Sequence, residues 1–204
     1  YIIRIFIVHI GGPEEVGLFT AGFAIVNGYV GLIFTAMGTD YYPRLAGVNK
    51  DNQKCKEMIN QQAEVAILII APIIMIFLLI APYAIILLYS NKFILIIGYM
   101  QWAMLGMIFK AASWSISYIF IAKQDMKTFL FNEISIKIFN VPLYLLMYKY
   151  LGLDGLGIGF MINYFVYFIL VYFVSKKKYK FSFIPSFNRL LLVSLILVLS
   201  CFIL

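Results

Sequence analysis

The stretch VGLFTAGFAIVNGYVGLIFTAMGTDYYPRL, residues 16–45, decides the class of fold. Residues 16–39 carry no charged side chain, and as a helix rising about 1.5 Å per residue they would cross about 30 Å of hydrocarbon. A polar signature follows, formed by Asp40, Tyr41, Tyr42, Pro43 and Arg44. Because proline lacks an N–H and clashes with the preceding turn, we expect the helix to end at Pro43. The stretch therefore predicts a membrane-spanning helix with a charged boundary.

The whole chain has the composition of a membrane protein. Of its 204 residues, 64% are hydrophobic and 12% are charged, whereas a soluble domain is about half apolar and a quarter charged. We expect an all-α polytopic membrane helical bundle without a nucleic-acid partner. Cys55 and Cys201 suggest neither a disulfide framework nor a metal site. Because the chain starts without methionine and both ends are apolar, we also expect a fragment of a longer protein.

Glycines, prolines and charged residues divide the apolar sequence into spans. We expect a transmembrane bundle over residues 1–180 and the start of a further transmembrane helix in residues 181–204. The expected spans are about 1–10, 16–39, 63–89, 94–122, 129–149 and 156–175, joined by a break at 11–15, a polar loop at 40–62, a turn at 90–93, a loop at 123–127, a glycine turn at 152–155 and a basic loop at 176–189.

Lysine and arginine are distributed unequally over these connections. The loops at 40–62, 123–127 and 176–189 hold eleven of them, whereas the opposite loops hold only Lys92 and Lys149. Loops on the cytoplasmic side of a membrane protein carry an excess of these residues. We therefore expect the first three loops to be cytoplasmic.

Three cations fall inside the expected spans: Arg4, Lys110 and Lys137. A charge at the bilayer centre costs about 2.5–3.5 kcal/mol on insertion scales, so these residues indicate a polar interior. Lys110 shares one helical face with Ser113 and Ser117. This face either lines a substrate cavity or forms a packing seam of small residues, with Lys110 extending toward the interface.

The span at 129–149 presents Glu133, Lys137, Asn140 and Tyr144 on one face. Glu133 precedes Lys137 by four residues, the favourable order for an ion pair on a helix. Either the pair is only a structural neutralisation near the interface, or it forms part of a cavity wall in which Glu133 holds the lysine until substrate arrives.

The first two spans contain Arg4 and one further polar residue, Asn27. Asn27 is the costly group in the centre of residues 16–39; close helix packing near Gly31 is its structural alternative. Arg4 could bind a phosphate through two parallel hydrogen bonds, or pair with an acid in a missing segment. For His9 we expect an interfacial hydrogen bond rather than a proton relay.

The sequence contains no paired carboxylates, Ser/His/Asp set or metal-ligand spacing of the kind that catalysis uses. The glycines of 152–159 follow a membrane span and lack the strand and acidic partner of a dinucleotide site. We therefore expect no enzymatic activity, no metal and no cofactor.

Four stretches, residues 16–21, 36–45, 81–93 and 152–157, resemble polysaccharide flippases. Over nearly all of residues 1–180 the chain looks like the C-terminal half of an O-antigen type translocase. This type lies within the multidrug/oligosaccharidyl-lipid/polysaccharide exporter (MATE-like) superfamily. The resemblance implies two six-helix bundles facing a central cavity, of which this chain is the C-terminal one. The signature at 40–44 would be its cytoplasmic mark.

The resemblance also implies a transport function. Such flippases move undecaprenyl-diphosphate-linked oligosaccharide, for O-antigen lipopolysaccharide or another surface polysaccharide, to the outer leaflet of the bacterial inner membrane by alternating access. The implied partners are this substrate, membrane lipids and other polysaccharide-assembly proteins. A MATE-type multidrug or organic-cation antiporter is the alternative, and would favour buried carboxylates over cations. A membrane-embedded polysaccharide polymerase or acyltransferase is disfavoured because the outer loops are short.

Overall fold

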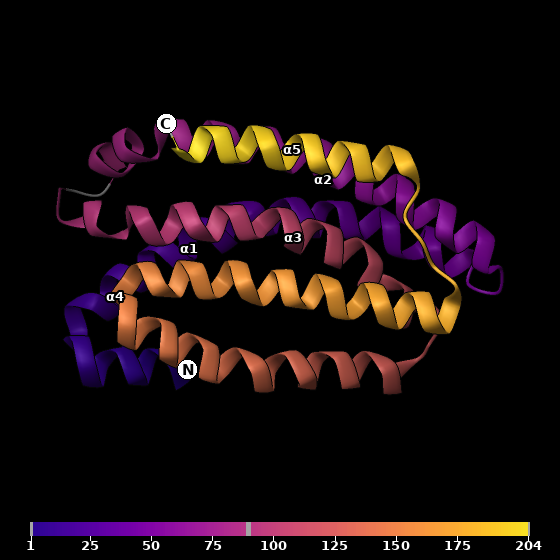
Figure 1. Cartoon of the computed structure of the whole chain (residues 1–204), viewed down its shortest axis with the longest axis horizontal. Coiled ribbons are helices and arrows are strands. Elements are labelled where there is room, and N and C mark those ends of the chain that lie inside the picture. The colour runs from indigo at the N-terminus through magenta and orange to yellow at the C-terminus, as the bar shows by residue number, and fades with distance from the viewer. Residues whose placement is uncertain (1, 89–90, 204) are drawn as a thin grey trace.

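The computed structural model describes residues 2–88 and 91–203, and these form a bundle of helices without a strand. The α-helices run roughly side by side (Figure 1). All five are long and apolar enough to cross a membrane, judged by length and composition. The protein is thus an all-α polytopic membrane helical bundle. Its elements are α1 (Ile2–Gly47), α2 (Asn52–Leu88), the 3₁₀-helix η1 (Asn91–Ile96), α3 (Ile97–Ala122), α4 (Met126–Tyr179) and α5 (Pro185–Ile203).

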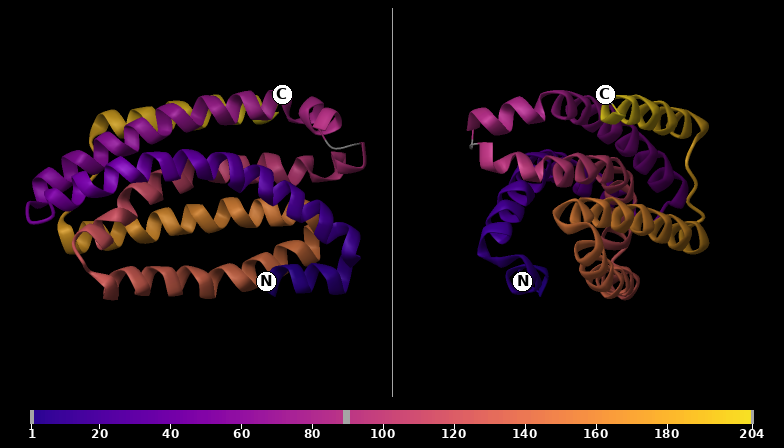
Figure 2. Two further views of the ribbon diagram at one scale, coloured as in Figure 1. Left: turned by 180° about the vertical axis from the view of Figure 1, so that it is seen from behind. Right: turned by 60° about the vertical axis from the view of Figure 1, so that its left-hand side comes forward.

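Helices α1 and α4 each fold back on themselves at a glycine. Their 46 and 54 residues would make straight helices roughly 70 and 80 Å long, more than twice the hydrocarbon thickness. The backbone leaves the helical region at Gly12 (φ 81°, ψ 177°) and Gly152 (φ 58°, ψ −140°), where a positive φ favours glycine. Each helix reverses its direction there (Figures 1 and 2). The expected breaks at 11–15 and 152–155 contain these two glycines.

The polar segment at 40–62 is mostly helical, contrary to expectation. The prediction that the helix ends at Pro43 is wrong, because α1 continues through Pro43 to Gly47. Proline deprives the preceding turn of one hydrogen bond, but Pro43 is exposed at a helix end, where water can satisfy the freed carbonyl. The expected turn at 90–93 begins at Ser90, which lies with Tyr89 outside the described residues, and η1 occupies the positions that follow.

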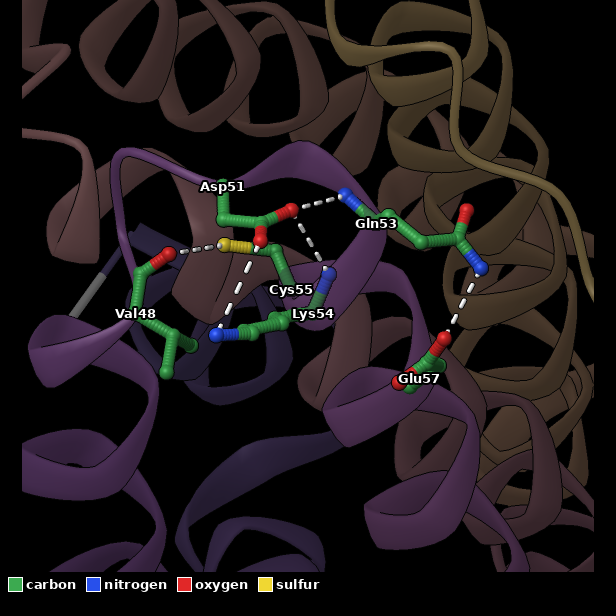
Figure 3. A network of polar contacts seen from close by, with 6 residues as sticks. All are labelled: Val48, Asp51, Gln53, Lys54, Cys55 and Glu57. Carbon is green, nitrogen blue, oxygen red and sulfur yellow. Dashed lines mark hydrogen bonds and ion pairs between the residues drawn. The ribbon is translucent and has the colours of Figure 1, made fainter.

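The turn between α1 and α2 is held by polar residues that cap the start of α2. Asp51 Oδ1 accepts hydrogen bonds from the backbone N–H groups of Gln53 at 2.9 Å and Lys54 at 3.1 Å (Figure 3). These bonds satisfy two of the donors that a helix start leaves unpaired, so Asp51 caps α2. The Cys55 thiol donates to the carbonyl of Val48 across the turn at 3.3 Å. The connection is therefore a capped turn of four residues, 48–51, between two helices.

The basic connections at 48–51, 123–125 and 180–184 lie at one end of the bundle, and the kinks at Gly12 and Gly152 lie at the other (Figure 1). We call the end that carries these connections the basic end. Asn49 links two of its connections: its Nδ2 donates to the carbonyl of Ala122 at 3.0 Å, and its own carbonyl accepts from the ammonium of Lys123. Side-chain contacts therefore hold this end together across three helices.

Asp125 is the centre of a second group of contacts at the basic end. Its carboxylate pairs with Lys178 and accepts hydrogen bonds from the Tyr179 hydroxyl and the backbone N–H of Thr128. Burial opposes ionisation, but the hydrogen bonds from Lys178, Tyr179 and Thr128 outweigh it. They hold the pKa of the Asp125 carboxyl well below its usual range. The start of α4 is thereby fixed to its own last turn.

Helix α3 lies at the centre of the bundle, in contact with α1, α2, α4 and α5. Glycine allows α4 to approach it closely. A methyl group added at Gly157 would overlap the backbone carbonyl of Tyr99, and one added at Gly106 would lie 2.9 Å from the Cα of Met161. Small residues at such points are typical of membrane helix pairs, since association there depends on close packing. This close approach brings α4 to the polar face of α3.

Candidate functional site

The structure brings two of the sequence-predicted polar residues into contact. The Lys110 ammonium on α3 donates to Asn27 Oδ1 on α1 at 3.1 Å. The same Nζ lies over the rings of Phe34 on α1, at 5.5 Å from the centroid, and Tyr164 on α4, at 5.2 Å. Phe160 on α4 contributes a third ring at 5.9 Å. Lys110 thus marks the junction of three helices, and we call these five residues the Lys110 site.

The amide of Asn27 is oriented by its own helix. Its Nδ2 donates to the carbonyl of Phe23 one turn earlier, at 3.4 Å. This bond turns Oδ1 outward, toward α3, where it accepts from Lys110. Asn27 therefore positions the ammonium without neutralising it.

Lys110 has no carboxylate partner among residues 2–88 and 91–203, where the ion pairs involve other residues. An ammonium has three donors, and Asn27 takes one of them. The aromatic faces stabilise a cation by about 0.5–2 kcal/mol each, depending on solvation. The Lys110 site therefore offers an anionic ligand a positive charge and N–H groups that can donate hydrogen bonds to it.

The serines of the same face have separate roles. Ser113 is buried and donates to the carbonyl of Lys110 at 3.0 Å; Ser117 is half-buried and donates to that of Trp114 at 2.9 Å. Both hydroxyl protons are thus bonded within α3. Whether Ser113 and Ser117 contact a substrate stays a prediction.

The predicted ion pair between Glu133 and Lys137 is not formed. Glu133 Oε1 instead accepts from the Tyr167 hydroxyl at 2.7 Å, between the two arms of α4. Lys137 is exposed and forms no ion pair within residues 2–88 and 91–203. Asn140 is half-buried and Tyr144 is buried, which divides the predicted face between two environments. Helical spacing places these side chains on one face. It does not reveal the competing hydrogen bond that Tyr167, in the second arm, donates to Glu133.

Arg4 lies apart from Lys110, in the short first arm of α1. Together with Ile3, Phe19 and Phe23 it lines a cavity of about 340 Å³. No ion pair in the described part of the chain includes it. Its proposed role toward phosphate stays a prediction.

The signature at 40–44 lies in the last turns of α1. Asp40 and Arg44 form an exposed pair at 2.8 Å. Tyr41 is buried and donates from its hydroxyl to the carbonyl of Ser115 at 2.7 Å, which fixes α1 to α3. Tyr42 is exposed. Of the five signature residues only Tyr41 is buried, and its contact with α3 gives the signature a structural role.

The sequence did not predict the three rings around Lys110. Phe160 and Tyr164 are four residues apart, and this spacing alone places them on one face of α4. No local signal shows that this face meets α3, because the contact depends on the reversal at Gly152 and on the approach at Gly157. The sequence also did not predict the contact between α4 and α1 at Tyr148. The Tyr148 hydroxyl donates a hydrogen bond to Glu15 Oε2 at 2.6 Å.

Comparison with protein families gives one finding: residues 1–98 match a family described as polysaccharide biosynthesis protein. The matched range covers α1 and α2 and includes Asn27 and the signature at 40–44; Lys110 and α4 lie beyond it. No match was found among curated proteins or among solved structures. The match and the membrane helices support a multi-pass membrane protein with a role in polysaccharide biosynthesis.

Proposed function

We propose that this protein is a flippase for undecaprenyl-diphosphate-linked oligosaccharide, the lipid-linked repeat unit of O-antigen or of another surface polysaccharide. It moves this substrate from the cytoplasmic to the outer leaflet of a bacterial inner membrane by alternating access. The similarity of residues 1–98 to polysaccharide biosynthesis proteins supports a role in the polysaccharide pathway. The observation that carries the transport role is the unneutralised Lys110 at the junction of α1, α3 and α4.

The physical problem of flipping is the diphosphate. Moving a charged group and many hydroxyls through hydrocarbon without partners costs far more than thermal energy supplies. A fixed ammonium replaces part of the water around a phosphate, and charge-assisted hydrogen bonds are stronger than neutral ones. Lys110 keeps donors for this purpose because Asn27 accepts only one hydrogen bond from it.

The distribution of charge supports an orientation for this transport. The lysine-rich connections lie together at the basic end of the bundle, and such residues are enriched on the cytoplasmic side. The basic end is therefore assigned to the cytoplasm, where the substrate would enter. Other polysaccharide-assembly proteins would act before and after this step as partners.

Deleting the gene in its native cell tests the proposal. The expected result is that lipid-linked repeat units are still made but accumulate on the cytoplasmic leaflet, because synthesis continues and movement stops. Labelling of the sugars in sealed, inverted and opened vesicles measures their side. If the deletion instead abolished synthesis of the lipid-linked units, the protein would act in making the substrate and the transport role would be wrong.

A further inference from the structure

A groove with a different chemistry adjoins the Lys110 site. It has a volume of about 570 Å³ and lies between α1, α3 and the first arm of α4, on the basic-end side of Lys110. We call it the aromatic groove. Its lining residues are Thr35, Gly38, Thr39, Tyr42, Trp114, Ser117, Tyr118, Ile121 and Phe129.

Ring surfaces dominate the aromatic groove. Trp114 and Tyr118 form an edge-to-face pair with centroids 5.0 Å apart, and Tyr42 lies 6.2 Å from Tyr118. Buried Tyr41 packs behind both Trp114 and Tyr118, at 5.7 and 5.4 Å. Its hydroxyl is bonded to the α3 backbone. The rings are therefore held in place before any ligand arrives, which lowers the entropic cost of binding.

The polar atoms of the groove divide into acceptors and donors. Thr35, Thr39 and Ser117 each donate their hydroxyl proton to a backbone carbonyl of their own helix, at 2.9–3.0 Å. Their oxygens remain as acceptors. The hydroxyls of Tyr42 and Tyr118 make no hydrogen bond within the described part of the chain. The groove thus offers phenol donors and aliphatic hydroxyl acceptors beside ring faces.

Charge separates this groove from the cavities at the basic end. None of its lining residues is lysine, arginine, aspartate or glutamate. The two cavities at the basic end, of about 530 and 800 Å³, are lined by lysines that include Lys127, Lys177 and Lys123. A neutral, amphipathic surface of rings and hydroxyls suits a sugar, since a pyranose presents C–H faces to rings and hydroxyls to donors and acceptors.

The aromatic groove and the Lys110 site share a wall. Phe34 lies under the Lys110 ammonium and packs against Trp114 at 5.3 Å. Trp114 follows Lys110 by four residues on α3, about 6 Å along the axis. A sugar joined to a diphosphate at Lys110 would therefore lie within reach of Trp114.

We propose that the aromatic groove is the glycan subsite and holds the sugars next to the diphosphate while Lys110 holds the diphosphate itself. This inference rests on the proposed flippase function. It assigns sugar contact to Tyr42, Trp114 and Tyr118 on the surface of the groove. Gly38 keeps the Tyr118 hydroxyl accessible in this subsite, because a methyl group at position 38 would lie 2.8 Å from that hydroxyl and obstruct it.

Two probes separate this inference from the proposed function: the lipid-linked oligosaccharide extracted from the native cells, and undecaprenyl diphosphate without sugar. Binding of each labelled probe to the immobilised, detergent-solubilised native protein is measured. Removing one phenol hydroxyl, in Tyr118→Phe or Tyr42→Phe, is expected to weaken binding of the glycosylated probe roughly threefold to tenfold. Binding of the sugar-free probe stays unchanged. Tyr150→Phe, at an exposed tyrosine beside the opposite kink, is the matched control.

The outcomes are distinct. A selective loss for the glycosylated probe supports the glycan subsite. If both variants bind both probes as the wild type does while Lys110→Gln weakens both, the glycan subsite is overturned and the flippase proposal stands. An equal loss for both probes also overturns the subsite. If the wild type binds neither probe, the proposed function itself is contradicted.

Discussion

Lys110 is the residue on which the proposed transport depends most. Lys110→Gln keeps much of the side-chain volume and can still bond Asn27, but it removes the charge. Hydrogen bonds to charged groups contribute about 1.5–3 kcal/mol, so we expect surface polysaccharide to fall roughly tenfold or more. The measurement is quantitative staining of surface glycan in cells that carry the variant in place of the native gene.

Lys110→Arg is the matched control for this change. It keeps the positive charge and the donors, so most surface glycan should remain. If surface glycan falls equally in both variants, with equal amounts of protein in the membrane, Lys110 has a packing role. That result would contradict an anion-binding site at Lys110.

Asp125 gives a prediction about pH. Its folded-state pKa is held below the usual value by Lys178, Tyr179 and Thr128, so its contribution to stability is present above the unfolded pKa of about 4. That contribution is lost as the pH falls from about 4 toward the lower folded-state value. In detergent, we expect thermal stability to fall more steeply below about pH 4 in the wild type than in Asp125→Asn. Parallel curves for the two proteins would show that Asp125 is not responsible.

At the residue scale, the sequence identified groups but not their partners. Lys110 and Asn27 were both predicted from the cost of a polar group inside an apolar span, and each was recognised within its own helix. Their contact joins residues 83 positions apart, and helical spacing shows faces without showing which faces meet. Glu133 illustrates the opposite error, since a favourable local spacing lost to a hydrogen bond from Tyr167.

At the scale of elements, the approach of α4 to α3 depends on Gly157. An added methyl group meets the backbone of Tyr99, which cannot move aside as a flexible side chain would. We expect Gly157→Ala to destabilise the fold by about 1–3 kcal/mol, the usual cost of overpacking. A lower thermal midpoint of the detergent-solubilised protein would measure this.

Gly159→Ala tests whether the effect comes from that contact. A methyl at Gly159 has its nearest neighbours at 3.7 Å, an ordinary contact distance, and alanine favours a helix over glycine by about 1 kcal/mol. The midpoint should be unchanged or higher. A similar loss in both variants would argue against a specific approach at Gly157.

The same elements show which boundaries a sequence can reveal. Gly12 and Gly152 lie inside expected breaks because an apolar run much longer than the hydrocarbon thickness must reverse, and glycine permits the backbone to do so. The end at Pro43 was misplaced because proline weakens a helix without ending it when water satisfies the carbonyl. Asp51, read as part of a loop, instead caps the next helix and shortens the connection.

For the whole molecule, the charge distribution predicts an orientation that chemical labelling can check. In a version with Cys55 and Cys201 replaced by serine, Glu14→Cys and Lys50→Cys each place an exposed thiol, at opposite ends of the bundle. A membrane-impermeant maleimide added to intact spheroplasts should label position 14 at once. Position 50 should react only after the membrane is opened. The reverse pattern would place the basic end outside and contradict cytoplasmic entry of the substrate.

The most direct test of the account is transbilayer movement of the substrate in proteoliposomes. The native protein is reconstituted with lipid-linked oligosaccharide extracted from its cells, and sugars on the outer leaflet are followed by an impermeant oxidant or lectin. We expect the wild type to exchange the substrate between leaflets. Lys110→Gln should exchange it more slowly by roughly tenfold or more, because the charge-assisted contact is lost. Equal movement in the wild type and in protein-free vesicles, or no dependence on Lys110, would contradict a flippase built around this cation.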